Sequence, residues 1–255
     1  MRVVRVFLIL GIVVVLLLVY WQVVWRGASD TTNSPTPNPP SENVVEFEWQ
    51  GAVLRAAWIR VDSPSSLVLY PNFTQRVSAQ AAKEDKGCRM LVSGGFYTKE
   101  NTPIGLFVSE GEKMADFRKS ALFNGFFTVP YEGNVSVSVE PPKEARVALQ
   151  GGPVLIKDGE IHELAIRNDE PARRIVVGIE DTDKIIFITL FDKSAPLRGP
   201  YLEELPQVIT RVQEITGMRL NDALNLDGGS ASAFYTQDTA LPEFAPVGSY
   251  FCVRE

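Results

Sequence analysis

The sequence predicts an α+β domain: a strand-rich mixed sheet domain with few helices, preceded by one transmembrane helix and a proline-rich linker. Short apolar segments recur at close intervals and are separated by Gly, Pro, Asn and Asp residues. Several alternate with a period of two residues, as Val135, Val137 and Val139 do, which is typical of half-buried strands. Only two segments have the period of an amphipathic helix. The domain should therefore consist mainly of sheet.

The first 26 residues predict a membrane anchor. Residues 6–25 are apolar except for Gln22, and as a helix they would be about 30 Å long, the thickness of a bilayer's hydrocarbon core. Arg2 and Arg5 precede this segment, which favours a cytoplasmic N-terminus and a domain on the periplasmic or cell-surface side. A cleaved signal peptide is the alternative, although no clear small-x-small cleavage site follows.

The composition separates a linker from the folded domain and limits its partners. Residues 27–42 contain four prolines and no large apolar residue, so they predict an extended tether before a domain at 43–255. Residues 1–26 hold three arginines and no acid, so the remainder has 22 basic and 31 acidic residues, a net charge of −9. This charge argues against nucleic acid as a partner and leaves the N-terminal helix as the only membrane contact.

The expected elements follow in chain order. A helix capped by Thr74 should run to about Glu84, and another should begin with Pro206 at its first position and end at Gly217. Leu205, Val208, Ile209, Val212 and Ile215 would form the apolar face of the second helix. The predicted strands are residues 44–49, 53–61, 67–70, 90–92, 104–108, 135–139, 147–149, 154–156, 175–179, 185–190, 222–226 and 231–235.

The two cysteines, Cys88 and Cys252, allow two interpretations. In an oxidising envelope they would pair and close a long loop, whereas two buried free thiols are the alternative. The sequence does not decide between them.

Several classes of site are excluded by the residue inventory. His162 is the single histidine, so a zinc site with two or more histidines is excluded. The chain contains no G-x-S-x-G elbow, no P-loop and no dinucleotide fingerprint. Glycine-rich segments between strands remain as candidates: SGGFY (93–97), QGGPVLIKDGEIH (150–162), ARRIVVGI (172–179), FITLFDKS (187–194) and NLDGGSAS (225–232).

Three Gly-Gly pairs and one aspartate are the strongest signals in these segments. A Gly-Gly pair after an apolar run is often only a turn or a bulge. Glycines also let backbone N–H groups approach a ligand, and consecutive N–H groups bind anions. Asp227 leaves an apolar strand directly into Gly228-Gly229, which predicts a functional carboxylate. Arg174 or Arg173, at the start of a strand, could present its planar guanidinium to a phosphate or form an ordinary surface pair.

The order of these segments resembles the phosphodiester glycosidase family, including its small bacterial envelope members. SGGFYTKENTPIGLFVSEG (93–111) resembles N-G-G-x-F followed by P-x-G-L-x-V, and residues 151–159 match G-G-P-x-L-x-x-x-G. RIVVG (174–178) and Asp192 resemble R-T-A-I-G and the strand ending in Asp that follows it, and residues 225–232 approach N-L-D-G-G-G-S-S. The chain departs from the family pattern at Ser93, Ile175, Lys193 and Ser230.

This resemblance implies hydrolysis of a glycosidic bond to phosphate in a carbohydrate or sugar-phosphate substrate. Such a site needs a carboxylate, donors for phosphate and stabilisation of an oxocarbenium-like transition state. Asp227 would be the key carboxylate, with Asp192 as its partner, and inversion and retention both remain open. The resemblance also implies that phosphate is bound by Arg174 and by the backbone around Gly94, Gly95, Gly151, Gly152, Gly228 and Gly229. Asn225, Ser230 and Ser232 would orient hydroxyl groups of the substrate. His162 would contact the leaving group.

Two alternatives remain from the residues themselves. In the first, a non-catalytic envelope module on the same fold would bind glycan or protein through aromatic residues. The competing interpretation of these aromatic residues is that they pack in the core. The sequence requires no cofactor, but Asp227 and Asp192 could hold a divalent cation, Ca²⁺ or Mg²⁺. The aromatic residues concerned are Trp49, Trp58, Phe126 and Phe127.

Overall fold

The computed structural model describes Tyr20 and residues 43–61, 63–180 and 184–254. The chain divides into two units, Met1–Pro40 and Ser41–Glu255, and the strands and helices discussed below all belong to the second. No helix within the described residues is long and apolar enough to cross a membrane. The expected anchor and linker, residues 1–42, lie outside the described residues apart from Tyr20, and both stay predictions.

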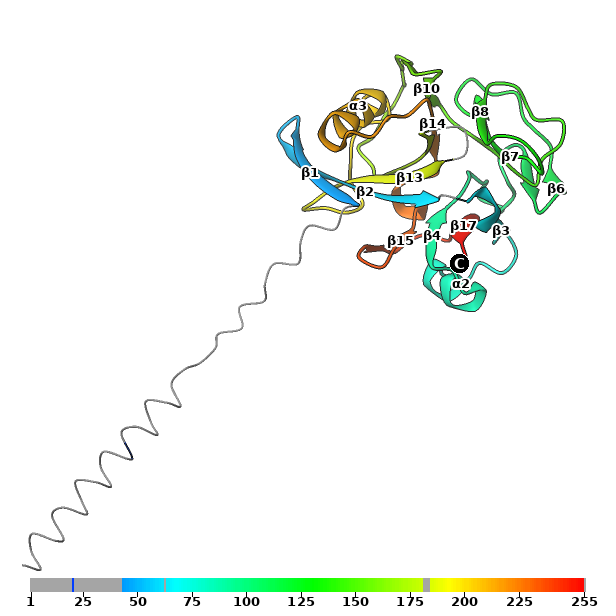
Figure 1. Ribbon diagram of the computed structural model, residues 1–255, viewed down its shortest axis with the longest axis horizontal. Helices are drawn as coiled ribbons and strands as arrows, with labels where there is room; N and C mark the ends of the chain where they lie inside the picture. The colour runs from blue at the N-terminus through cyan, green and yellow to red at the C-terminus, as the bar shows by residue number, and fades with distance from the viewer. Residues whose placement is uncertain (1–19, 21–42, 62, 181–183, 255) are drawn as a thin grey trace, which may run out of the picture. The chain divides into compact units, whose positions relative to one another are not determined.

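A seven-stranded sheet organises the domain, and all of its pairings are antiparallel (Figure 1). Two of its hairpins turn at Gln50-Gly51 and Asp158-Gly159, where all four residues have positive φ, as the favoured two-residue hairpin turn requires. In spatial order the strands are β1 (Val44–Trp49), β2 (Ala52–Val61), β13 (Ile185–Asp192), β12 (Arg174–Ile179), β14 (Asp222–Leu226), β10 (Val154–Lys157) and β11 (Glu160–Ile161).

Two five-stranded antiparallel sheets complete the domain. The first has the order β16 (Ala240–Leu241), β15 (Phe234–Tyr235), β4 (Met90–Ser93), β17 (Ser249–Val253) and β3 (Leu67–Pro71). The second has the order β6 (Glu112–Ala115), β5 (Phe107–Ser109), β9 (Val147–Gly151), β7 (Gly125–Val129) and β8 (Ser136–Ser138).

The main hydrophobic core lies where the three sheets meet. Phe187 of β13, Phe251 of β17 and Phe127 of β7 come from different sheets and are fully buried. Their ring centroids are 4.9 Å apart for Phe187 and Phe251 and 5.6 Å apart for Phe127 and Phe251, which is the spacing of interacting aromatic pairs. The expected strand-rich domain with few helices is therefore confirmed.

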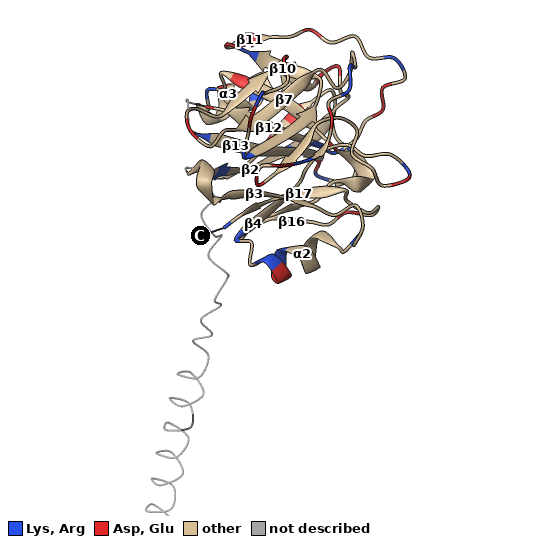
Figure 2. Cartoon of the chain, turned by 90° about the vertical axis from the view of Figure 1, so that its right-hand side faces the viewer, with Lys and Arg blue, Asp and Glu red and all other residues tan. Residues whose placement is uncertain are grey.

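Two α-helices cover the outer faces of this core. Figures 1 and 2 show them at opposite ends of the domain, with the sheets between them. Helix α3 (Leu205–Thr216) packs its apolar stripe on the seven-stranded sheet, and Gly217 ends it with a φ of 73°. This helix confirms the prediction, except that Pro206 is its second residue and Ile215 is 40% exposed.

The N-cap of helix α2 (Ala79–Lys86) lies four residues later than the predicted cap. Its N-cap is Ser78, whose side chain accepts a hydrogen bond from the N–H of Ala81, so the prediction of Thr74 was wrong. The side chain of Asn72 explains the difference: it accepts from the N–H of Val77 and donates to that residue's carbonyl. These bonds hold the preceding segment in a turn, which excludes a helix there.

Cys88 and Cys252 form a disulfide with a Cα–Cα distance of 5.3 Å. The bond joins β17 to the segment that leads from α2 into β4. Of the two interpretations left open above, the structure therefore favours the paired cysteines.

The aromatic residues considered for a binding module are mostly in the core. Trp58, Phe126 and Phe127 are buried, and Trp49 is partly buried. Their use in packing, the other interpretation above, is the one that the structure shows.

Candidate active site

A pocket of about 400 Å³ lies at the end of β14 and the start of β12. The turn after β14 forms one wall and the loop 166–172 another. Phe96, after β4, and Phe123, before β7, line it as well and lie in contact with a ring-centroid distance of 4.6 Å. Of the predicted site residues, Gly152, Arg174, Asn225, Asp227, Gly228 and Gly229 line this pocket.

The strand register explains why Asp227 and Arg174 share the pocket. In the antiparallel pair of β12 and β14, Ile175 lies opposite Leu226. Arg174 is the first residue of β12, and Asp227 directly follows β14, so the two residues come next to this last pair. The pairing thus brings the guanidinium of Arg174 and the carboxyl group of Asp227 to the same pocket.

Asp227 is held through its backbone, while its carboxyl group faces the pocket. Its N–H donates to the carbonyl of Gly94 at 3.2 Å, and its Oδ1 accepts from the N–H of Gly228 at 3.0 Å. Burial of the carboxyl group raises the pKa of Asp227 to about 8, and the Gly228 hydrogen bond opposes this only in part. At neutral pH the group is therefore mostly protonated.

Asn225 contributes an unpaired oxygen to the same wall. Its side chain is 3% exposed, and its Nδ2 donates to the carbonyl of Gly152 at 2.8 Å. Its Oδ1 has no hydrogen-bond partner among the described residues. A buried oxygen without a donor costs free energy, so a ligand hydroxyl at this position would relieve that cost.

The glycine N–H groups expected to bind phosphate are mostly occupied within the protein. Gly228 donates to Asp227, Gly229 donates to the carbonyl of Arg173 at 2.7 Å, and Gly152 donates to the carbonyl of Asn225 at 2.8 Å. The N–H groups of Gly94 and Gly95 donate to the carbonyl and to Oγ of Ser249, at 2.8 and 3.1 Å.

These glycines instead allow two backbone segments to lie in contact. A Cβ at Gly228 would collide with the carbonyl oxygen of Arg173, and a Cβ at Gly151 would lie 2.9 Å from the carbonyl oxygen of Asn225. The close approach that was expected toward a ligand is thus an approach between segments of the chain itself.

Arg174 connects the pocket to the loop beside it. Its guanidinium donates to Asp169 at 3.2 Å and to the carbonyls of Glu170 and Pro200 at 2.6 and 3.0 Å. Burial lowers the pKa of Arg174, and the nearby Asp169 opposes that shift. Two of these three bonds hold the loop 166–172 in position.

Arg173 and Ser232 fix the turn that follows Asp227. Arg173 is fully buried, and its guanidinium donates to Ser232 Oγ at 2.7 Å, to the Ser232 carbonyl and to the carbonyl of Pro242 at 2.9 Å. Burial lowers the pKa of Arg173 to about 10, which leaves it charged at neutral pH. Ser232 Oγ in turn donates to the carbonyl of Gly229 at 2.6 Å, so it has no hydrogen left for a substrate.

Seven predicted site residues do not line this pocket: Gly94, Gly95, Gly151 and Ser232, described above, and Asp192, His162 and Ser230. Asp192 lines a different pocket and accepts from the N–H and Oγ of Ser194, both at 2.7 Å, which lowers its pKa. His162 follows β11, where its N–H donates to the carbonyl of Leu155. Ser230 is exposed and is not among the pocket's lining residues.

Two residues at the site were missed by the sequence reasoning. Arg167 is exposed at the pocket and, within the described part of the chain, makes no hydrogen bond or ion pair. Tyr97 has a hydroxyl without a hydrogen-bond partner in the same part, and burial together with the charge of Asp227 raises its pKa. Both residues have a weak signal in the sequence: Arg167 lies shortly before the Arg173-Arg174 pair, and Tyr97 directly follows the segment GGF (94–96).

No group of three or more metal-ligating side chains forms in the described ranges. Asp227 and Asp192 line different pockets, so the pair considered for Ca²⁺ or Mg²⁺ is not brought together.

Comparison with known sequences identifies the family. The sequence profile of the phosphodiester glycosidase family matches residues 86–254, well over half of the chain. The chain belongs to this family. No curated protein sequence matches it.

Solved structures share the fold at low sequence identity. The catalytic domain of zebrafish N-acetylglucosamine-1-phosphodiester alpha-N-acetylglucosaminidase, auto-inhibited by its pro-peptide, has a TM-score of 0.60 and 13% identity, over 83% of this chain and 81% of that one. A hypothetical protein from Synechocystis has a TM-score of 0.55 and 12% identity, over 83% and 62%. A putative exported protein from Burkholderia pseudomallei has a TM-score of 0.51 and 12% identity, over 80% and 74%.

The phosphodiester glycosidase family supports a glycosidase-type function for this chain. The family match begins after β3, yet β2 pairs with β13 and β3 pairs with β17. The first three strands are therefore integral parts of the sheets in this member of the family.

Proposed function

We propose that this phosphodiester glycosidase hydrolyses the bond between a sugar and phosphate in a sugar phosphodiester, at the pocket around Asp227. The observation that carries the proposal is the carboxyl group of Asp227, with its pKa raised to about 8, in a pocket that Arg174 also lines. A titratable group perturbed by burial and placed in a cleft is the usual property of a catalytic acid or base.

Asp227 acts as the proton donor. A phosphodiester carries a negative charge, and its approach would raise the pKa of Asp227 further, so the group is protonated when substrate binds. The bond between the anomeric carbon and the bridging oxygen breaks, and that oxygen keeps the electron pair and takes the proton of Asp227. Water then adds to the oxocarbenium-like carbon and loses a proton, which restores Asp227.

Arginines and an amide position the substrate. Arg167 lacks an ion-pair partner within the described residues, so its guanidinium is available for the phosphate. Arg174 supports the loop that carries Arg167 and adds positive charge to the pocket. Asn225 Oδ1 accepts a hydrogen bond from a sugar hydroxyl, which satisfies the unpaired buried oxygen.

The test is release of free sugar from a panel of sugar-1-phosphate diesters. We expect Asp227→Asn to lower kcat/KM by about 10²- to 10⁴-fold, the usual contribution of a positioned general acid. Asp192→Asn is the matched control, because Asp192 also ends a strand of the seven-stranded sheet but lines another pocket. Full turnover in the Asp227→Asn protein would exclude the proposal.

The pH profile distinguishes a proton donor from a base. Because the acid form is the active one, kcat/KM should fall as pH rises through about 8, and a rise over the same range would assign Asp227 as a base instead. Saturable glycan binding without turnover of any diester would favour the non-catalytic module.

We also propose that the domain works outside the cytoplasm. The apolar segment 6–25 with its preceding arginines supports export, and the Cys88–Cys252 disulfide suits an oxidising compartment. In intact cells, a membrane-impermeant thiol reagent should label these cysteines only after reduction. Labelling that requires cell lysis would contradict this location.

A further inference from the structure

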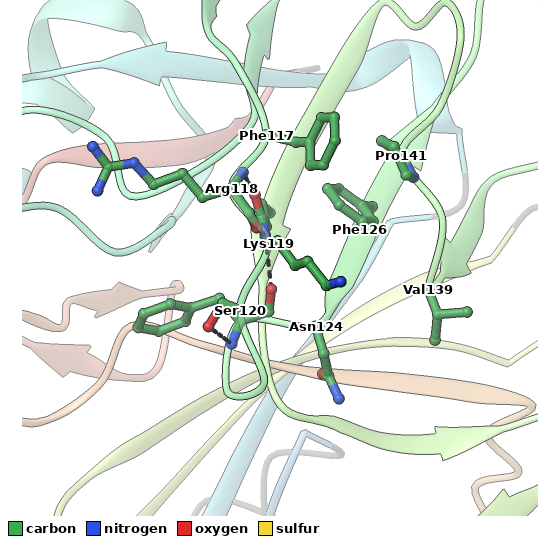
Figure 3. Close-up of a pocket in the computed structure, with 10 residues that line it drawn as sticks. Phe117, Arg118, Lys119, Ser120, Asn124, Phe126, Val139 and Pro141 are labelled. Atoms are coloured by element: carbon green, nitrogen blue, oxygen red, sulfur yellow. Dashed lines mark hydrogen bonds between the residues drawn. The ribbon is translucent and has the colours of Figure 1, made fainter.

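A second pocket, drawn in Figure 3, shares a lining residue with the pocket that contains Asp227. It has a volume of about 310 Å³ and is lined mainly by apolar groups of the segment 117–126 and by Val139 and Pro141. Phe123 lines both pockets, so the two pockets share one residue of their walls. A molecule extending from the first pocket past Phe123 would enter the second.

The wall of the second pocket is held in place by Gln150. All hydrogen-bonding positions of its side-chain amide are used. Nε2 donates to the carbonyls of Arg118 and Phe123 at 2.6 and 2.7 Å. Oε1 accepts from the N–H groups of Arg118 and Leu106 at 2.9 and 3.0 Å. Gln150 is 2% exposed, so these bonds are shielded from water. The segment thus forms a built surface over β9.

An exposed aromatic ring lies on this surface. Phe117 is 53% exposed, and its ring meets the edge of the buried Phe126 ring at a centroid distance of 6.4 Å. Figure 3 shows the two rings side by side, with Pro141 beyond them. An aromatic face held in this way offers an apolar platform to one face of a sugar ring.

The charge of the pocket is positive although the domain is acidic. Its described lining contains Arg118 and Lys119 and no acidic side chain, and Figure 3 shows Arg118 extending away from Phe126, which leaves Lys119 as the cation on that side. The ammonium group of Lys119 makes no ion pair or hydrogen bond with any described residue, and its side chain extends to the same side as Phe126 and Val139 (Figure 3). Most charged residues elsewhere lie on loops, on strand ends and on α2 (Figure 2). An anionic group is therefore the complement of this pocket.

We propose that the second pocket binds the next unit of a phosphate-linked glycan, on the leaving-group side of the bond that is cleaved. Lys119 holds a further phosphate and the Phe117 ring contacts the sugar. The preferred substrate is then an oligomer or polymer joined by phosphodiesters and not an isolated sugar-1-phosphate diester. This inference rests on the proposed function for the position of the cleaved bond.

The test compares a minimal sugar-1-phosphate diester with a short oligomer of the same sugar joined by phosphodiesters. In the full chain, Lys119→Ala should raise KM for the oligomer by about 5- to 10-fold relative to KM for the minimal diester, the usual net size of one hydrogen bond. This ratio should shrink at high salt. Lys83→Ala, which removes an equal charge from α2 at a residue that lines neither pocket, is the control and should leave the ratio unchanged.

Ring chemistry provides the second variant pair. Phe117→Tyr keeps an aromatic face and should keep the preference for the oligomer, whereas Phe117→Leu keeps apolar bulk and should lose it. The proposal would be overturned if Phe117→Tyr and Phe117→Leu had the same preference for the oligomer. It would also be overturned if Lys119→Ala changed KM by the same factor for both substrates.

A binding measurement separates this inference from the catalytic one. Calorimetry of the oligomer with Asp227→Asn protein, with and without Lys119→Ala, reports the second pocket without turnover. Weaker binding of the oligomer by the double variant supports the second pocket. This holds even if no diester is hydrolysed, because a lack of hydrolysis counts only against the proposed reaction. Hydrolysis of the minimal diester together with equal oligomer binding would reject the second pocket alone.

Discussion

The carboxyl group of Asp227 makes the stability of the domain depend on pH. Its pKa is raised from 3.8 to about 8 by burial, so between these values the folded protein binds more protons than the unfolded chain. The stability that this group provides is complete below about pH 4 and is lost as pH rises toward 8. The slope from this one group is at most about 1.4 kcal/mol per pH unit.

Asp227→Asn removes this titration and tests it directly. We expect the variant to gain stability relative to the wild type as pH rises from 5 to 8, since the amide stays neutral. Urea unfolding of both proteins at several pH values measures the difference. A difference that does not change with pH would mean that Asp227 is ionised in the folded protein.

Single residues also show how far sequence reasoning reached. Asp227 was predicted from its position after an apolar strand, and the structure places it in the pocket. Asp192 followed an equally apolar strand, yet its oxygen accepts from Ser194 in another pocket. Both aspartates end an apolar run, but only Asp227 is followed by Gly-Gly. The packing around the two strand ends places them in different pockets.

The turn after β14 requires glycine at position 228, because there is no room for a Cβ. Gly228 has a φ of −129°, which any residue can adopt, but a Cβ there would collide with the carbonyl oxygen of Arg173. Gly228→Ala should therefore lower the free energy of unfolding by about 1–3 kcal/mol, as overpacking does, and also lower turnover, because the turn carries Asp227.

The matched variant is Gly159→Ala in the hairpin of β10 and β11. Gly159 has a φ of +80° and open space around it, so alanine costs about 1 kcal/mol through the backbone and leaves turnover intact. Chemical denaturation and the sugar-release assay on both variants check this. Equal turnover in the two would show that the position of the turn does not matter for the reaction.

Elements with strong local patterns were predictable, whereas others were not. The strand at 44–49 was predicted with the bounds that the structure has, because its apolar run ends in a clear turn. β17 and β7 were missed, although both are buried along their whole length. Their residues, SYFCV and GFFTV, have no alternation because both faces of these strands are covered.

The disulfide acts at the scale of the whole molecule. Cys88 and Cys252 are 164 residues apart, so the bond restricts much of the unfolded chain. Replacing both cysteines by serine should lower the free energy of unfolding by about 2–5 kcal/mol. Chemical denaturation of the double variant, with the wild type under reducing conditions as the comparison, measures this loss. Equal stability of the oxidised and reduced wild type would contradict the bond.

The sequence by itself determined the family, the strand-rich class and the bounds of the strand 222–226. These properties follow from ordered motifs and from periodicity, which are local along the chain. Only the tertiary structure decided which groups share the pocket and which donors are already used. The N–H groups of Gly228 and Gly229 were expected to bind phosphate, but they donate to Asp227 and Arg173. Hydrogen-bond partners and burial depend on segments far apart in sequence, because the three sheets bring them together only in the folded domain.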